Sequence, residues 1–149
     1  MKVRLAAHSE LNTVLDLCKK LIAESPVFSK QRFNERSTTA FINHQISKDS
    51  VLVVLDEYEN VIGAAICATC IDWRTGDRLA IEQGIYVLPE YRCSKAGILL
   101  VKGFKEWAAN NEADRIQIGT MSGIEAERVV KLYERLGFNQ AGYVLEAEV

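Results

Sequence analysis

Residues 79–111 read LAIEQGIYVLPEYRCSKAGILLVKGFKEWAANN and carry the clearest structural pattern of the chain. The apolar first part of this stretch predicts a strand over Leu79–Leu88, which Pro89 closes. Over Ser94–Asn111 apolar residues recur three and four positions apart, which predicts the strongest helix in the chain. The stretch therefore joins a strand to a helix through a short polar turn.

Further strands and helices are predicted on both sides of this unit. Those before it are a strand over Val3–Ala6, a helix from an N-cap at Ser9 to a stop at Ser25–Pro26, a helix over Phe33–Ile46, and strands over Val51–Leu55 and Val61–Ile71. Those after it are a strand over Arg115–Gly119, a helix over Glu125–Leu136 ended by Gly137, and two short strands within Phe138–Val149. The order β-α-α-β-β-β-α-β-α-β-β predicts an α+β domain with one mixed sheet.

The composition places the chain among soluble globular proteins. Hydrophobic residues make up 48% of its 149 residues and charged residues 26%, which is close to the average of such proteins and excludes a disordered chain. No apolar run approaches the ~20 residues that a membrane helix needs, and Met1–His8 lacks the apolar core of a signal peptide. We therefore expect one cytoplasmic domain over residues 1–149, without a membrane partner.

The charge of the chain argues against nucleic acid as a partner. Its formal net charge is −2, which gives no electrostatic footprint for a polyanion. Residues 1–50 carry +3 and residues 51–149 carry −5. The acidic part favours a cationic substrate such as an amine, unless it is only a solvated surface.

Four cysteines, Cys18, Cys67, Cys70 and Cys93, predict neither a metal site nor a disulfide. Cys67 and Cys70 have the spacing of a metal or redox pair, but no second pair follows, and neither histidine has matching spacing. In a strand the two positions point to opposite faces. We interpret both as buried thiols.

The turn between the strand and the helix has the features of an anion site. The first N–H groups of a helix lack partners and carry the positive end of its dipole. Ser94, Ala96 and Gly97 are small enough for an anion to approach the backbone, and Arg92 and Lys95 add two cations. The turn therefore predicts a phosphate or pyrophosphate site, the alternative being a helix start with solvated charges.

Two motifs of this chain resemble those of the GNAT (GCN5-related N-acetyltransferase) superfamily. Pro89–Gly97 resembles its acyl-coenzyme A pyrophosphate loop, Gln/Arg-x-x-Gly-x-Gly/Ala, with Arg92 and Gly97 at the two ends. Lys131–Phe138 resembles its second signature, Leu-Tyr-x-x-x-Gly-Phe, and the element order is similar too. The resemblance covers nearly the whole chain. It implies a GNAT-like single domain whose mixed, mostly antiparallel sheet is flanked by about four helices.

The chain departs from the family pattern at two positions. Lys95 stands where the middle Gly is usual, as in the Arg-x-Ser-Lys-Ala-Gly loops of a subset common in phages, and we interpret it as an added phosphate ligand. Ala126 stands where many members have an Asn that contacts the cofactor arm. This second change implies weaker coenzyme A binding or a different pocket wall.

The resemblance also implies the cofactor and its site. Acetyl-coenzyme A is the implied co-substrate, a primary amine the acceptor and direct transfer in a ternary complex the reaction, with no metal. The end of the fourth strand is expected to splay from its neighbour and pair with the pantetheine arm, the N–H of Val87 holding the developing oxyanion. Backbone amides after Arg92 are expected to cradle the pyrophosphate. The implied cofactor-binding residues are Ile85, Tyr86, Val87, Arg92, Cys93, Ser94, Lys95, Ala96, Gly97 and Ile98.

Two side chains are the candidates for catalysis. The resemblance implies that Tyr133 protonates the departing thiolate, the alternative being an aromatic that only packs. An amine acceptor needs a base, because an ammonium has no lone pair. Glu82 is the only carboxylate on its strand, although many relatives place theirs one position later, at Gln83 here. Alternation puts Glu82 on one face with Gly84 and Tyr86. A structural carboxylate is the alternative.

Several alternatives stay open at this point. Lys95, Ala126 and Gln83 also fit a catalytically degenerate acyl-coenzyme A-binding module that acts through a protein partner. A further alternative is an enzyme that transfers another acyl group, such as succinyl. The acceptor is a small amine, an antibiotic, or a lysine or N-terminus of a protein, and Trp73 and Tyr86 are candidates to line its site. Dimers are common in the family, so a homodimer is open too.

Overall fold

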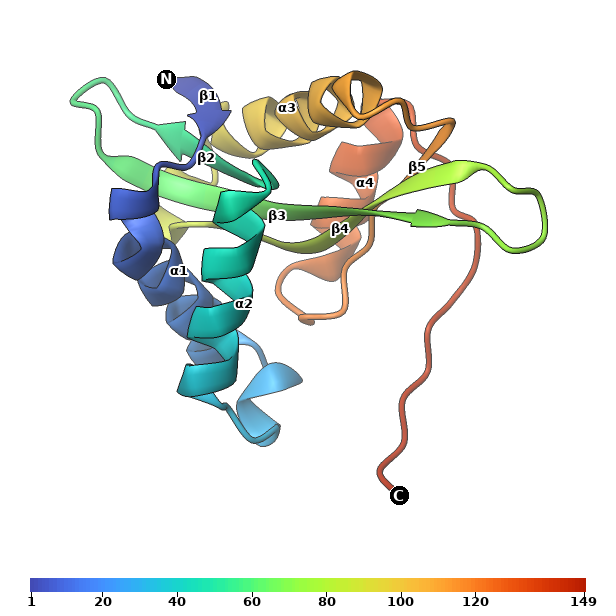
Figure 1. Cartoon of the computed structure of the whole chain (residues 1–149). Coiled ribbons are helices and arrows are strands. Elements are labelled where there is room, and N and C mark those ends of the chain that lie inside the picture. The colour runs from blue at the N-terminus through green and yellow to red at the C-terminus, as the bar shows by residue number, and fades with distance from the viewer.

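A five-stranded mixed sheet forms the centre of the computed structural model, which describes residues 1–149 (Figure 1). Its strands, in spatial order, are β1 (Lys2–Leu5), β2 (Val51–Leu55), β3 (Val61–Ile71), β4 (Arg78–Val87) and β5 (Arg115–Gln117). Neighbours from β1 to β4 are antiparallel, and β5 runs parallel to β4. The predicted α+β class with a mixed, mostly antiparallel sheet is confirmed.

Four helices cover the two faces of this sheet, as predicted. They are α1 (Leu11–Glu24), α2 (Glu35–Ser47), α3 (Ala96–Asn110) and α4 (Ala126–Arg135). Short 3-10 turns occupy His8–Glu10, Phe28–Lys30 (η2) and Pro89–Tyr91 (η3). Figure 1 shows α1 and α2 on one face, and α3 on the other with α4 beside it. None of the helices combines the length and the apolar character that a membrane crossing requires.

The sheet is buried on both faces at β2, which explains its uninterrupted apolar sequence. Val51, Val53 and Leu55 pack in the core under α1 and α2. Leu52 and Val54 pack in the second core under α3, with Phe104 among others. A strand that alternates between two cores needs apolar side chains at every position.

The predicted strands within Phe138–Val149 are wrong. This segment has no regular structure and runs as an extended tail away from the sheet (Figure 1). Tyr143, Val144 and Leu145 are 85%, 72% and 91% exposed, and a bond from Gln31 Nε2 to Glu146 Oε1 (2.7 Å) ties the tail to the body. Beyond Phe138, which packs against Tyr133 of α4, these exposed apolar side chains have no neighbouring strand to pair with, so nothing stabilises a strand there.

Two smaller expectations are also corrected. Ser9 lies inside a 3-10 turn and is no N-cap, because Glu10 closes this turn by accepting a hydrogen bond from Ala7 N (2.8 Å). Cys67 is buried as expected, but Cys70 is exposed. The β3–β4 hairpin extends beyond the helices at that point, so the outer end of β3 faces solvent.

A one-residue bulge interrupts β4 next to Glu82, the predicted catalytic base. Gly84 is opposite Ile66, and Glu82 is opposite the next residue of β3, Cys67. Gln83 is therefore the extra residue on β4, which is the definition of a β-bulge. Ile66 belongs to the core under α1 and α2, whereas Cys67 belongs to the core under α3.

The bulge reverses the face on which Glu82 lies. Tyr86 packs in the core under α1 and α2, and Gly84 is on that face too, opposite Ile66. Glu82, opposite Cys67, is turned toward α3 and α4. The prediction that put it on one face with Gly84 and Tyr86 is wrong, because it assumed regular alternation along the strand.

Candidate active site

A cleft of about 760 Å³ opens where β4 and β5 part. The two strands pair only from Leu79 opposite Arg115 to Ile81 opposite Gln117. Beyond that point β5 ends and the chain continues into a loop, so the second half of β4 has a free edge. The walls are this edge, the turn before α3, the loop over residues 119–125, one side of α4, and Leu21 and Phe28.

The free edge of β4 presents backbone N–H groups to the cleft. Leu88 N donates to Ile62 O (2.9 Å), and Val87 is opposite Gly63 in the register. Bonded and non-bonded pairs alternate in an antiparallel ladder, so the N–H groups of Val87 and Ile85 point away from β3. The donor predicted for an oxyanion, Val87 N–H, is therefore directed at the cleft.

The start of α3 offers a second set of N–H groups. Ser94 N donates to Tyr91 O (3.0 Å) and Ala96 N to Ser94 Oγ (3.1 Å), so these two amides are already bonded. The N–H groups of Gly97 and Ile98 have no acceptor within the chain, and both residues line the cleft. Free N–H groups at the positive end of a helix of 15 residues can bind an anion.

The guanidinium of Arg92 braces the turn and is not aimed at the start of α3. Nη1 and Nη2 bind the two carboxylate oxygens of Glu24 at 2.5 and 2.6 Å, and Nε donates to Val87 O at 3.0 Å. The same guanidinium lies 5.3 Å over the ring of Tyr86, whose hydroxyl donates to Glu24 (2.9 Å). Arg92 lowers the pKa of Glu24. This cluster ties α1 to β4 and to the turn.

The cation beside the anion site is one that the sequence reasoning missed. Lys95 is exposed and does not line the cleft, whereas Arg128 on α4 does. Its Nη2 is 3.6 Å from Cys93 Sγ, and its Nη1 binds Glu125 Oε1 at 3.0 Å. Three cations on one side of α4 line the cleft at helical spacing: Arg128, Lys131 and Arg135. Because residues three, four and seven apart lie on one side of a helix, this spacing in the sequence indicates a basic side of α4.

Glu82 is a carboxyl group without a cationic partner. It lines the cleft half-buried and accepts a hydrogen bond from Gly119 N at 3.4 Å. Burial raises the pKa of Glu82 to about 7, although the Gly119 hydrogen bond acts in the opposite direction. Near neutral pH this group can both take up and release a proton, as a general base must.

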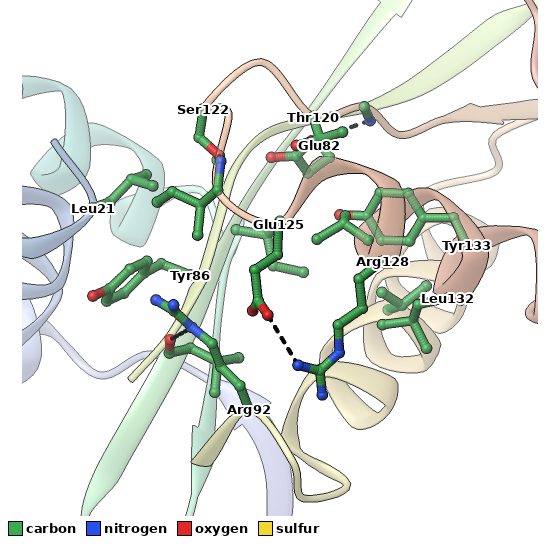
Figure 2. Close-up of a pocket in the computed structure, with 18 of the residues that line it drawn as sticks. Leu21, Glu82, Tyr86, Arg92, Thr120, Ser122, Glu125, Arg128, Leu132 and Tyr133 are labelled. Carbon is green, nitrogen blue, oxygen red and sulfur yellow. Dashed lines mark hydrogen bonds and ion pairs between the residues drawn. The ribbon is translucent and has the colours of Figure 1, made fainter. Parts of the chain in front are cut away.

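Tyr133 projects its ring from α4 into the same part of the cleft, beside Glu82 (Figure 2). Its side chain is buried, yet no hydrogen bond to its hydroxyl is present, and no fully buried side-chain oxygen lacks a partner. The hydroxyl therefore opens onto the cleft. Burial, and then the charge of Glu82, raise the pKa of Tyr133. The phenol is neutral at physiological pH and has a proton to donate.

Ten of the twelve predicted site residues line this cleft. The exceptions are Lys95, which is exposed, and Ala96, the first residue of α3, which is buried in the core between α3 and the sheet. Of the two aromatics expected near an acceptor, Tyr86 lines the cleft, but Trp73 is 88% exposed at the tip of the β3–β4 hairpin. That tip extends beyond the body of the protein. No three His, Cys, Asp or Glu side chains gather as a metal ion would require.

A comparison with protein families identifies the class of this protein. The acetyltransferase (GNAT) family model matches residues 15–138. The match includes the turn before α3 and all of α4, which carry the two motifs. The chain belongs to the acetyltransferase (GNAT) family and is an N-acetyltransferase by that membership. No curated protein sequence matches it.

Solved structures share the fold over nearly the whole chain. A transcriptional regulator from Bacillus halodurans has a TM-score of 0.78 at 18% identity, with 99% of each chain covered. An acetyltransferase from Trypanosoma brucei has a TM-score of 0.72 at 18% identity, also with 99% of each chain covered. Aminoglycoside acetyltransferase AAC(6')-Iy, bound to a coenzyme A bisubstrate analogue, has 0.77 at 19% identity, covering 99% of this chain and 97% of that one.

Proposed function

We propose that this chain transfers the acetyl group of acetyl-coenzyme A directly to a primary amine in a ternary complex. One observation carries the proposal: the Glu82 carboxyl, with a pKa of about 7, and the Tyr133 hydroxyl face one cleft at the parted ends of β4 and β5. A base and an acid are what amine acylation by a thioester needs.

The cleft has groups that fit each part of the cofactor. The free edge of β4 at Ile85–Val87 would pair with the pantetheine arm, and the amides at the start of α3 with the pyrophosphate. Acetyl-coenzyme A supplies the thioester. Glu82 takes a proton from the acceptor ammonium, and the amine then attacks the thioester carbonyl, whose developing oxyanion accepts from the N–H of Val87. The C–S bond breaks as Tyr133 gives its proton to the departing sulfur, and the second proton lost by the nitrogen returns Tyr133 to the neutral phenol. No covalent enzyme intermediate is needed.

Further parts of the proposal rest on the family resemblance. The alternative of a degenerate acyl-coenzyme A-binding module is not favoured, because candidate acid and base both reach the cleft. The loop Arg92–Gly97 supports membership in the subset common in phages. We further propose that residues 1–149 form one cytoplasmic domain without nucleic-acid partners. A homodimer and a longer acyl group are both compatible with this proposal.

Acetyl-coenzyme A is expected to stabilise the folded chain. A ligand that binds only the folded state at 100 times its dissociation constant adds about 2.7 kcal/mol to the free energy of unfolding. The melting temperature, followed by differential scanning fluorimetry, should therefore rise with acetyl-coenzyme A and with coenzyme A. No shift with either at millimolar concentration would contradict the enzyme and the binding module alike.

Arg128→Ala is expected to weaken coenzyme A binding by about tenfold. A charge-assisted hydrogen bond to a phosphate contributes roughly 1.5–3 kcal/mol, and partial exposure of Arg128 reduces this value. Lys95→Ala should weaken binding less, because its ammonium has to reach the phosphates from solvent. Titration calorimetry at low and high salt measures both. If Lys95→Gly binds coenzyme A more tightly than the parent at both salt concentrations, Lys95 is not a phosphate ligand.

A further inference from the structure

The cleft has two chemically different ends. One end is basic and lies at the turn before α3, where Arg128 and the free N–H groups of Gly97 and Ile98 line the cleft. The other end lies between α1, η2 and the loop over residues 119–125. Figure 2 shows Leu21 and Tyr86 on this second side, across the cleft from Arg128 and Leu132.

The second end is closed by contacts between two segments far apart in the sequence. Ser25 Oγ donates to Ser122 O at 2.5 Å and accepts from Phe28 N at 2.9 Å. A Cβ placed on Gly123 would lie 2.9 Å from Pro26 Cγ, so the loop rests directly on the turn after α1. These contacts fix the side chains that both segments direct into the cleft.

Four of those side chains are apolar, and they stand beside the polar Thr120, Ser122 and Glu125 of the loop. We name Leu21, Phe28, Met121 and Ile124, all of which line the cleft, the apolar wall. Met121 is 46% exposed although it is a large hydrophobic residue. Tyr143, Val144 and Leu145 of the C-terminal tail stay exposed, so these side chains are not packed on this wall. An apolar surface left open inside a cleft is typical of a ligand site.

Only one carboxylate near this end has no cationic partner in the protein. Two carboxylates line the cleft, Glu82 and Glu125, and Glu125 is paired with Arg128. The nearby carboxylate of Glu24 is held by both guanidinium nitrogens of Arg92. Glu82 alone has no cationic partner. Every further ammonium of a polyamine or an aminoglycoside would enter this end without a counter-charge and with its hydration reduced.

We propose that the acceptor is a small primary monoamine with an apolar body, such as an alkylamine or an arylalkylamine. Its ammonium binds beside Glu82, and its apolar body packs on the apolar wall. Met121 follows two residues after Gly119, which donates its N–H to Glu82. One loop therefore contacts the group that binds the amine and also contributes to the apolar wall. This inference rests on the proposed function and names the substrate class of the same site.

The test measures acetyl transfer from acetyl-coenzyme A to propylamine, pentylamine, phenethylamine, spermidine, kanamycin and a capped lysine peptide. For the alkylamines kcat/KM should rise about threefold to fourfold per added methylene, as burial of each methylene predicts. Phenethylamine should exceed spermidine and kanamycin by about tenfold or more. Equal or higher kcat/KM for a polycation or for the lysine peptide would overturn the proposal.

A matched pair of variants connects this selectivity to the apolar wall. Met121→Glu should lower kcat/KM for pentylamine about tenfold and raise it for spermidine, because the second ammonium gains a counter-charge. Ile71→Glu makes the same kind of change at an exposed apolar residue outside the cleft and should change neither value. Equal responses of the two variants would contradict a role for the apolar wall.

The same amines should also be titrated into protein saturated with coenzyme A. Their order of affinity tests the acceptor class even where no acetyl transfer occurs. Absence of transfer to every amine would contradict the proposed function, whereas an affinity that does not rise with apolar length would contradict the apolar acceptor.

Discussion

Glu82→Gln is expected to lower turnover by about 10²–10⁴-fold with little change in the affinity for coenzyme A. The amide keeps the size of the side chain but cannot accept the proton of the acceptor ammonium. In the parent enzyme kcat/KM should rise with pH through about 7, where Glu82 loses its proton. In the variant this rise should disappear. The measurement is a pH profile of thiol release with a reactive amine.

Glu90→Gln is the matched control for this variant. Glu90 is exposed on η3 and does not line the cleft, so its replacement should leave both turnover and the pH profile unchanged. A Glu82→Gln enzyme as active as the parent would make Glu82 a structural carboxylate.

Glu82→Gln should also be more stable than the parent at pH 8. The pKa of Glu82 is about 7 in the fold and about 4.3 in an unfolded chain. Between these pH values the folded state holds the extra proton, so the stability that this group contributes is complete below about pH 4.3 and is lost as pH rises through about 7. Gln does not ionise and avoids a loss of roughly 3–4 kcal/mol at pH 8.

Urea unfolding at pH 5 and pH 8 measures this difference. The gain of Glu82→Gln over the parent should be larger at pH 8. A structural carboxylate that mainly holds Gly119 predicts the opposite, because Gln would then be the less stable variant at pH 8. Loss of activity combined with a gain in stability is what a catalytic group in an unfavourable site produces.

The helices and strands of this fold could be predicted because each has its own periodicity. The apolar positions of α3 recur at helical spacing, and β2 is an uninterrupted apolar run buried on both faces. The tail beyond Phe138 misled the same reasoning. Its composition suits a strand, but pairing and burial need a partner, and no neighbouring strand meets it in the structure.

The site was harder to predict wherever it depends on contacts between distant segments. Arg92 was expected at the phosphates because it stands in the loop motif, but its guanidinium binds Glu24, which lies 68 positions earlier. The bulge at Gln83 adds one residue to β4 without changing the local composition. It turns Glu82 toward Tyr133 and away from Tyr86. Neither event has a local signal in the sequence.

Tyr133→Phe is expected to lower turnover by about 10²–10⁴-fold while leaving coenzyme A binding nearly unchanged. The hydroxyl opens onto the cleft without a partner in the protein, and its raised pKa keeps it protonated. A thiolate that leaves without a proton is a poorer leaving group, so loss of this donor slows the collapse of the tetrahedral adduct. The ring still packs against Phe138, whose centroid lies 6.2 Å away, so the fold should be retained. Single-turnover kinetics together with coenzyme A titration measure the two effects separately.

A double variant distinguishes a catalytic Tyr133 from an aromatic that only packs. If Glu82 and Tyr133 act on the same transition state, Glu82→Gln/Tyr133→Phe should lose less than the product of the two single losses. Tyr91→Phe is the control, because it removes a hydroxyl that binds Asp56 at 3.3 Å outside the cleft. Its turnover should equal that of the parent. Parent-like turnover of Tyr133→Phe itself would assign Tyr133 to packing, and the proton for the sulfur would then have to come from solvent that enters the cleft beside α4.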